Sequence, residues 1–173
     1  DFYSVRHSWD DAFCQMPDGM TGLRIGIPRR FFFEDLEPGI GEAVEEAGIQ
    51  MGQLGAVITE IELDAADSAQ QDVMPMVWAD AYEYHRERAE RNPELFGKDV
   101  LDRILLGRDI SGRDYAAALR ARERWNRVID RALQEVDVIL TPTTPRAAPL
   151  IESSTDMLAT THHLTRFTYL FSW

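Results

Sequence analysis

The chain has 173 residues, of which 45% are hydrophobic and 28% are charged, the balance of a soluble globular domain. No stretch approaches the roughly 18 consecutive apolar residues of a membrane-spanning helix, and the formal net charge of −12 argues against anionic membranes and nucleic acids as partners. Cys14 is the only cysteine, which excludes an intrachain disulfide and favours a cytoplasmic location.

The first half of the chain predicts a strand, a helix and a second strand. Residues 1–21 show no sustained periodicity, so we expect an irregular lead-in. Residues 23–27 form a short apolar run that ends at a proline, which is typical of a strand. Apolar residues then recur at helical spacing over 40–54, and Gly55 follows as a helix stop. Alternating apolar residues over 57–63 predict the second strand.

The second half predicts helices and then a third strand. Residues 64–73 and 76–91 read as two helices separated by Pro75, and a short helix near 98–106 ends at Gly107. A further helix begins at Ser111, with a capping-box-like Asp114 three residues later. Its predicted apolar seam comprises Tyr115, Leu119, Arg122, Trp125, Ile129, Leu133 and Val136. Residues 136–140 predict the third strand, so the fold class is α/β, with a small parallel or mixed sheet covered by helices.

Several sequence blocks, in this order, resemble the later half of the amidase-signature family. The blocks are residues 22–29 (GLRIGIPR), 54–57 (LGAV), 80–86 (DAYEYHR), 92–97 (NPELFG), 114–124, 137–145 (DVILTPTTP) and 164–169 (LTRFTY). Their order and spacing carry the resemblance more than any single block does. It implies that residues 22–173 form a single α/β domain, which is a fragment of a larger amidase domain.

The resemblance also implies a chemistry. The family hydrolyses a carboxylic amide to an acid and ammonia or an amine, and it uses a serine nucleophile, a second serine joined through a cis peptide, and a lysine base. It uses no metal and no cofactor. A serine hydroxyl needs a neighbouring group to accept its proton before it can attack a carbonyl. In the family the nucleophile lies in a Gly/Ser-rich run before the strand that 22–29 resembles.

This chain contains no such Gly/Ser-rich run. Its one serine pair, Ser153–Ser154, has no flanking glycines, and its one lysine, Lys98, lies where the family has no base. Arginine stays protonated in proteins and does not replace lysine as a base. We therefore assign no catalytic residue to this chain and expect the catalytic residues to lie upstream of it.

What the chain can supply is one wall of the substrate site. Ligands of open α/β sheets bind beyond the carboxyl ends of the strands, where the loop after the third strand begins, and the resemblance brings the aromatic tail close to the pocket. The candidate residues that contact a small-molecule amide substrate are Thr141, Thr143 and Thr165 through their hydroxyls, and Tyr84, Phe167 and Tyr169 through their rings. Core packing and turn formation are the alternative roles for the same residues.

Two other functions remain open. The first is that the chain is part of an amidotransferase A subunit, although the YEYH and NPELFG blocks favour the broader amidase branch. The second is that the chain is a non-catalytic binding or assembly module. The aromatic tail over 167–173 leads us to expect self-association as a homo-oligomer, or dependence on an added partner. His162–His163 does not predict a metal site, because no carboxylate or thiol cluster accompanies it. The arginines over 113–131 are better explained as a solvated helix face than as a nucleic-acid surface.

Overall fold

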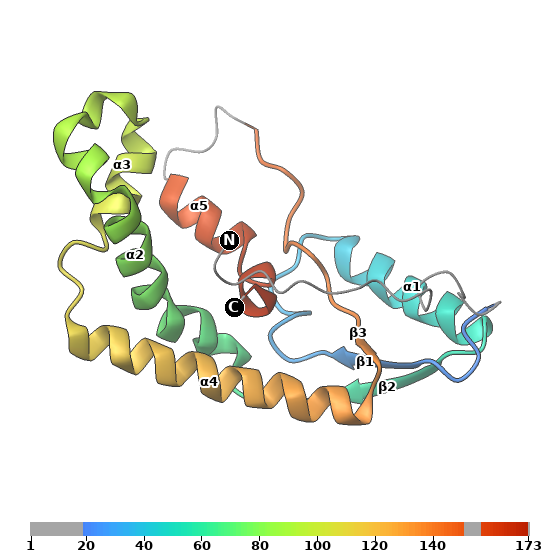
Figure 1. Ribbon diagram of the computed structural model, residues 1–173. Helices are drawn as coiled ribbons and strands as arrows, with labels where there is room; N and C mark the ends of the chain where they lie inside the picture. The colour runs from blue at the N-terminus through green and yellow to red at the C-terminus, as the bar shows by residue number, and fades with distance from the viewer. Residues whose placement is uncertain (1–18, 151–156, 173) are drawn as a thin grey trace, which may run out of the picture.

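The computed structural model describes residues 19–150 and 157–172. Figure 1 shows a small sheet with helices packed around it. The elements are β1 (Arg24–Pro28), α1 (Ile40–Gln53), β2 (Val57–Ile61), α2 (Ala66–Arg91), η2 (Pro93–Leu95), α3 (Lys98–Leu105), α4 (Gly112–Glu135), β3 (Val138–Ile139), α5 (Met157–Leu164) and η4 (Thr168–Phe171). The mixed α/β class expected from the sequence is confirmed.

The sheet has three parallel strands in the order β2-β1-β3. Ile25 of the central strand pairs with Ile58 on one side and with Val138 on the other. β2 ends at Ile61, two residues before the predicted end, where it faces Pro28. Since proline has no amide hydrogen to donate, the ladder stops there. β3 covers only two of the residues predicted over 136–140, although the Leu140 amide still donates to the Gly26 carbonyl at 2.9 Å.

Helices cover both faces of the sheet, so the domain is layered. On one face, a Cβ added to Gly48 of α1 would lie 3.2 Å from Cδ1 of Ile27. On the other face, a Cβ added to Gly26 would lie 2.6 Å from Cδ1 of Ile61 and 3.0 Å from Cγ2 of Val136, which follows α4. Glycine at position 26 therefore lets these two side chains meet over the middle of the sheet.

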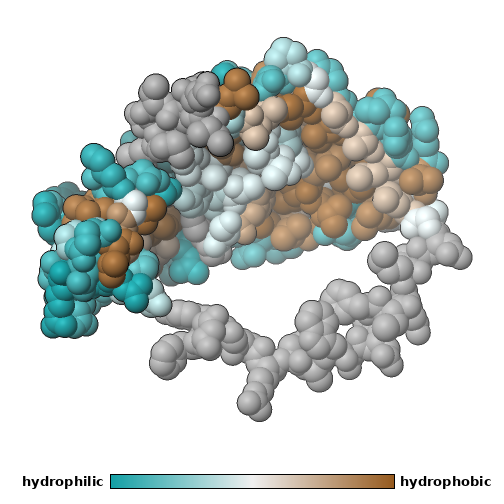
Figure 2. Space-filling view, turned by 90° about the horizontal axis from the view of Figure 1, so that it is seen from above, coloured by the Kyte–Doolittle hydropathy of each residue, from teal (hydrophilic) through white to brown (hydrophobic). Residues whose placement is uncertain are grey.

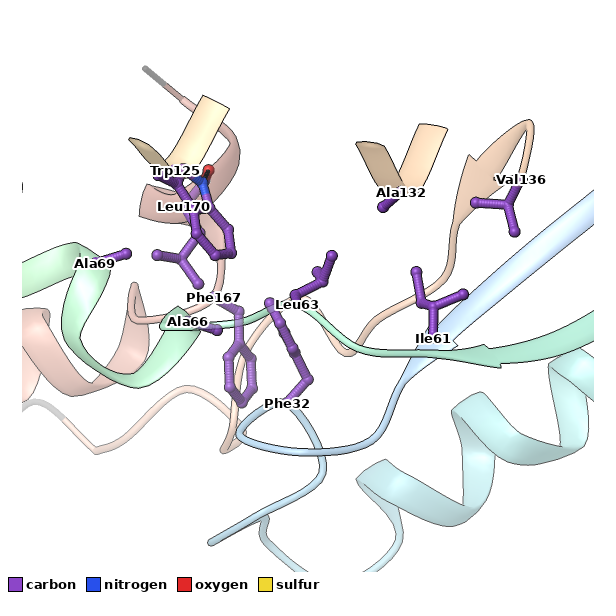
Figure 3. Close-up of a cluster of buried hydrophobic side chains, with 10 residues drawn as sticks. All are labelled: Phe32, Ile61, Leu63, Ala66, Ala69, Trp125, Ala132, Val136, Phe167 and Leu170. Carbon is purple, nitrogen blue, oxygen red and sulfur yellow. Dashed lines mark hydrogen bonds between the residues drawn. The ribbon is translucent and has the colours of Figure 1, made fainter. Parts of the chain in front are cut away.

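The main core lies between α4, the end of β2, the start of α2 and the carboxyl-terminal segment (Figure 3). Trp125 is 2% exposed, and its indole Nε1 donates to the Leu170 carbonyl at 2.5 Å. This hydrogen bond joins α4 to η4 across 45 residues of chain. The buried members of the core are Phe32, Ile61, Leu63, Ala66, Ala69, Trp125, Ala132, Val136, Phe167 and Leu170.

α2 is one continuous helix, so the prediction of two helices separated at Pro75 was wrong. Proline inside a helix removes one backbone hydrogen bond at a cost of about 3 kcal/mol. Buried residues lie on both sides of it: Val73 and Met74 before, and Met76 after. Packing of this segment against α4 offsets the cost and keeps the helix continuous through Pro75.

The start of α4 agrees with the sequence, and its buried face agrees only in part: Trp125 and Val136 of the predicted seam are buried. The Ser111 hydroxyl accepts from the Asp114 amide at 3.1 Å, as the predicted cap requires. The buried face is carried by small residues together with Trp125, whereas Leu119 and Leu133 of the predicted seam are 38% and 44% exposed. Small residues lie on this face because α2 and α4 approach each other closely. A prediction from the spacing of large apolar residues therefore does not find the alanines of the buried face.

One face of the molecule, seen from above, carries hydrophobic residues across its middle, and hydrophilic residues are frequent toward the end that carries α3 (Figure 2). No helix within the described ranges combines the length and the apolar character needed to cross a membrane.

Candidate functional site

The carboxyl ends of the parallel strands meet at one edge of the sheet. The loop after β1 and the loop after β3 are joined there, because the Glu37 amide donates to the Pro145 carbonyl at 2.8 Å. The Ala147 amide in turn donates to Oε2 of Glu37 at 2.9 Å. The chain comes back to this edge through α5, as Figure 1 shows. Ligands of parallel α/β sheets bind at such an edge, so it is the candidate site.

Four charged or titratable side chains meet at this edge; we call them the Asp35 cluster. The cluster consists of Asp35 after β1, Arg146 after β3, His163 in α5 and Arg166 just beyond α5. Its carboxylate lies 3.5 Å from Nη2 of Arg146, 4.0 Å from Nε2 of His163 and 3.8 Å from Nη1 of Arg166. One carboxylate therefore faces three basic groups.

The hydrogen bonds of the cluster set the protonation of its histidine. Nε of Arg146 donates to Nε2 of His163 at 3.1 Å, so that ring nitrogen acts as an acceptor and the imidazole is neutral. Burial lowers the pKa of His163, and the guanidinium groups of Arg166 and Arg146 lower this pKa further, against the opposite effect of Asp35. The cluster therefore holds two fixed positive charges and one negative charge near neutral pH.

Arg166 is the most enclosed member of the cluster. Its side chain is 15% exposed, and burial lowers the pKa of its guanidinium. Its Nη2 donates to the carbonyl oxygen of Glu34, and its guanidinium carbon lies 4.6 Å from the centre of the Phe167 ring and 5.5 Å from that of Phe31. Backbone acceptors and aromatic faces thus hold this cation in place.

A pocket of about 460 Å³ opens beside the cluster; we call it the edge pocket. Its polar wall contains three members of the Asp35 cluster together with Thr160, and its other wall is apolar. The lining residues are Asp35, Arg146, Ala147, Pro149, Ala159, Thr160, His163 and Leu164.

Five of the six predicted substrate-contacting residues lie on the segments around this edge, and none of them lines the edge pocket. Thr141 is half-buried and Thr143 is exposed, both directly after β3. The Thr165 hydroxyl donates to the Thr161 carbonyl at 2.7 Å. Phe167 is 1% exposed within the core, and Tyr169 is half-buried in η4. Their contact with a substrate stays a prediction.

The sixth predicted residue, Tyr84, lies apart from the others. Its side chain is 82% exposed on the second half of α2, and its ring packs edge-on against His85 with centroids 4.8 Å apart. The depression around it is lined by residues of α2 and by Leu95 of η2, with Arg88 among them. The structure does not bring Tyr84 together with the threonines after β3.

The described residues hold no assembled hydrolytic centre. Lys98 is 89% exposed and forms an ion pair of 2.6 Å with Asp102 one turn later, and the hydrogen bond from its ammonium to that carboxylate raises the pKa of Lys98. A lysine in that state does not act as a base in a cleft. Ser153–Ser154 and Cys14 lie outside the described residues. Within the described ranges, no group of three or more histidines, cysteines and carboxylates is placed to hold a metal ion.

Sequence reasoning missed the Asp35 cluster. Its members come from three separate segments, and Arg166 and Glu34 are 132 positions apart in the chain. No local spacing signals such a contact. In the structure Asp35 adopts a left-handed backbone with φ of 49°, a conformation that aspartate tolerates better than most residues.

The geometry alone does not decide the family of the chain, and comparison with known proteins does. The model of the family named Amidase matches residues 13–172. The chain belongs to the amidase-signature family. An amidase of Pseudomonas putida is 33% identical over 127 residues, which cover 73% of this chain and 27% of that protein. The A subunit of the glutamyl-tRNA(Gln) amidotransferase of Alkaliphilus metalliredigens (strain QYMF) is 32% identical over 160 residues, which cover 79% of this chain and 33% of that protein.

Solved structures agree with the family assignment at the level of the fold. A crystal structure of an amidase matches with a TM-score of 0.71 and 24% identity, over 79% of this chain and 31% of that one. The glutamyl-tRNA(Gln) amidotransferase A subunit from Thermotoga maritima matches with a TM-score of 0.63 and 24% identity, over 88% of this chain and 33% of that one. The chain spans between about a quarter and two fifths of the length of the curated relatives it matches.

Proposed function

We propose that this amidase-family chain is the carboxyl-terminal portion of an amide hydrolase, in which it forms one wall of the substrate site. The observation that carries the proposal is the match of the family over residues 13–172. In the complete enzyme, a serine nucleophile, a second serine in cis-peptide linkage and a lysine base upstream of this chain hydrolyse a small-molecule amide to its acid and ammonia or an amine. No metal or cofactor takes part.

The role of a wall rests on where the predicted contacts lie. Thr141 and Thr143 follow β3 at the carboxyl edge of the sheet, and Thr165 lies on the segment that returns to it. Hydroxyl groups at this edge offer hydrogen bonds that orient an amide, while the catalytic residues supply the nucleophile and the stabilisation of the oxyanion. The isolated chain lacks those catalytic groups, so we expect it to be inactive alone.

The experiment measures ammonia release from simple aliphatic amides. The chain is assayed alone, and then together with the amino-terminal part of the Pseudomonas putida amidase, in which we expect the family's catalytic residues to lie. We expect no release by the chain alone and release from the mixture. Release by the chain alone that is abolished in Lys98→Met would contradict the proposal, because the base would then lie in this chain.

A non-catalytic binding or assembly module is the second candidate, and the breadth of the exposed apolar surface favours it; Ile49, Leu54 and Val57 are more than half exposed. The gene upstream of the codon for Asp1 separates the two. A Gly/Ser-rich segment preceded by a lysine codon supports the hydrolase, and an upstream region without either supports the module. Gel filtration of the purified chain tests the self-association expected from the same surface.

A further inference from the structure

The two outer strands of the sheet differ in composition. β1 lies between β2 and β3, so within residues 19–150 and 157–172 each outer strand pairs on one side only. β2 carries polar residues, and its Glu60, with a side chain 61% exposed, forms an ion pair of 3.3 Å with Arg29. Charged side chains are characteristic of strands that stay at the edge of a sheet, because they oppose pairing with a further strand. β2 therefore has the features of a permanent edge.

β3 has the opposite composition. Val138 and Ile139 of this strand and Leu140 directly after it form a continuous apolar run. Such a run is typical of a strand inside a parallel α/β sheet, where both faces are covered. Yet Val138 is 42% exposed, and Ile139 and Leu140 are only half-buried. The described residues thus leave partly uncovered a strand whose sequence suits the interior of a sheet.

The outer side of residues 138–140, which we call the β3 edge, offers backbone groups to a further strand. The Leu140 amide donates to the Gly26 carbonyl of β1 at 2.9 Å. Neighbouring residues of a strand direct their backbone groups to opposite sides, so the N–H and C=O of Ile139 point away from β1. No strand among the described residues pairs with this side of β3. Such unpaired groups are a template for the addition of a strand.

The length of the relatives indicates what pairs with the β3 edge. The matched part is 27% of the Pseudomonas putida amidase and 33% of the Alkaliphilus metalliredigens A subunit, so most of each relative lies outside it. Sheets of globular proteins have about 5–6 strands on average, and the described residues form three. We infer that the β3 edge pairs with a parallel, apolar strand from the amino-terminal part of an amidase-family domain, and that β2 stays an edge. The source of that strand rests on the proposed function.

Pairing at the β3 edge also bears on the candidate site. A parallel strand added there ends beside the carboxyl end of β3, where Thr141 and Thr143 begin the following loop. Residues that follow the added strand then lie next to these two threonines, at the edge where parallel α/β sheets bind their ligands. The β3 edge would therefore align the amino-terminal part of the domain with the wall that this chain supplies.

The test is capture of the amino-terminal part of the Pseudomonas putida amidase, co-expressed with this chain, through an affinity tag on this chain. Val138→Lys is expected to reduce capture about tenfold or more, because the added strand would bury an unpaired ammonium group. Val57→Lys is the matched control, since Val57 is 52% exposed on β2, and it should capture as much as the unsubstituted chain. Both valines are exposed in this chain, so both variants should keep its thermal midpoint. No capture by the unsubstituted chain, or an equal or larger loss in Val57→Lys, overturns the inference.

Amide hydrogen exchange locates the contact without a substitution. In the captured complex the Ile139 amide should exchange about tenfold more slowly than in the chain alone, because a strand bond now protects it. The Glu60 amide is the internal control. It points outward from β2, because the Val57 amide three residues earlier donates to the Leu23 carbonyl at 2.8 Å, and its exchange rate should not change. Slower exchange at Glu60 with none at Ile139 places the added strand on β2. Protection of Ile139 in the chain alone that disappears on dilution identifies a second copy as the occupant, and either result overturns the inference.

Capture and hydrogen exchange require no hydrolysis, so their outcome is separate from that of the ammonia assay. Capture that depends on Val138, without ammonia release from the mixture, supports the β3 edge and removes the hydrolase proposal. Ammonia release that Val138→Lys leaves unchanged supports the hydrolase and removes the β3 edge.

Discussion

The two helical layers of the domain differ in how completely they cover the sheet. α4 and the start of α2 enclose a continuous core in which Trp125, Ile61 and Val136 are each no more than 7% exposed. α1 on the opposite face buries only Gly48, and its Ile49 is 56% exposed. The main core of the described residues therefore lies on the α4 side, whereas the α1 side leaves apolar surface that the described residues do not cover.

The largest expected effect is on the α4 side. Trp125→Ala removes the central ring of the core and should lower the free energy of unfolding by about 3–5 kcal/mol, measured by urea denaturation. Trp125→Phe keeps most of the ring and loses only the hydrogen bond to the Leu170 carbonyl. It should cost about 1–3 kcal/mol. An Ala variant no less stable than the Phe variant would show that α4 does not carry the core.

The next effect tests how closely α2 meets the end of α3. A Cβ added to Gly107 would lie 1.9 Å from the Trp78 carbonyl oxygen, so neither backbone can give way easily. Gly107→Ala should therefore cost about 1–3 kcal/mol through overpacking. Gly112→Ala is the matched control, because its added Cβ meets nothing within 4 Å. The control is expected to keep or raise the thermal midpoint, and an equal loss in both variants would point to a general glycine effect instead of a clash.

A smaller effect concerns the docking of the carboxyl-terminal segment at the edge pocket. The pKa of His163 is lowered from its ordinary value of 6.5 in the folded chain, so the unfolded chain binds a proton more readily and stability falls as pH drops through that value. Arg146, Arg166 and Asp35 are the charged groups that face this imidazole. Thermal midpoints between about pH 7.5 and 5.5 should fall less steeply in His163→Gln, whose amide stays neutral, than in the wild type. His162→Gln, at an exposed neighbouring position, is the control. If the thermal midpoint depends on pH equally in all three proteins, His163 does not cause the loss of stability.

The smallest effect is expected on the α1 side. Ile49→Ala should change the stability of the isolated chain by no more than about 0.5 kcal/mol, as for other surface positions. The same substitution is the informative one for association. If the uncovered α1 side makes the contact, Ile49→Ala shifts the gel-filtration profile toward smaller species, whereas an unchanged profile places any self-association elsewhere.

The sequence predicted the elements well wherever one short pattern determined them. A short apolar run predicted β1 and alternation predicted β2. The Ser111 cap located the start of α4, and Gly55, with φ of 100°, ended α1 as expected. The errors arose where packing decides the outcome: Pro75 lies within a helix because buried neighbours hold it, and the α4 face is chosen by the approach of α2. The motif blocks identified the family that the Amidase match confirmed.

The candidate site was less accessible to sequence reasoning than the fold. The carboxyl edge was predicted as the location of the site because parallel topology places strand ends together, and substrate binding at this edge stays a prediction. The Asp35 cluster was not predicted, since each of its four residues reads locally as an exposed turn or helix-end charge. Only the three-dimensional return of α5 to the loop after β1 makes them neighbours.

The hydrogen bonds that join Glu37 to Pro145 and Ala147 also constrain the order of folding. Glu37 and Ala147 are separated by 110 positions in the chain. Closing so long a loop has an entropic cost, and helices, whose contacts are local, form without that cost. We expect α2 and α4 to form their contacts early, and the two loops at the edge to be joined only after β3 has paired with β1. The pocket is then among the last parts of the chain to acquire its native arrangement.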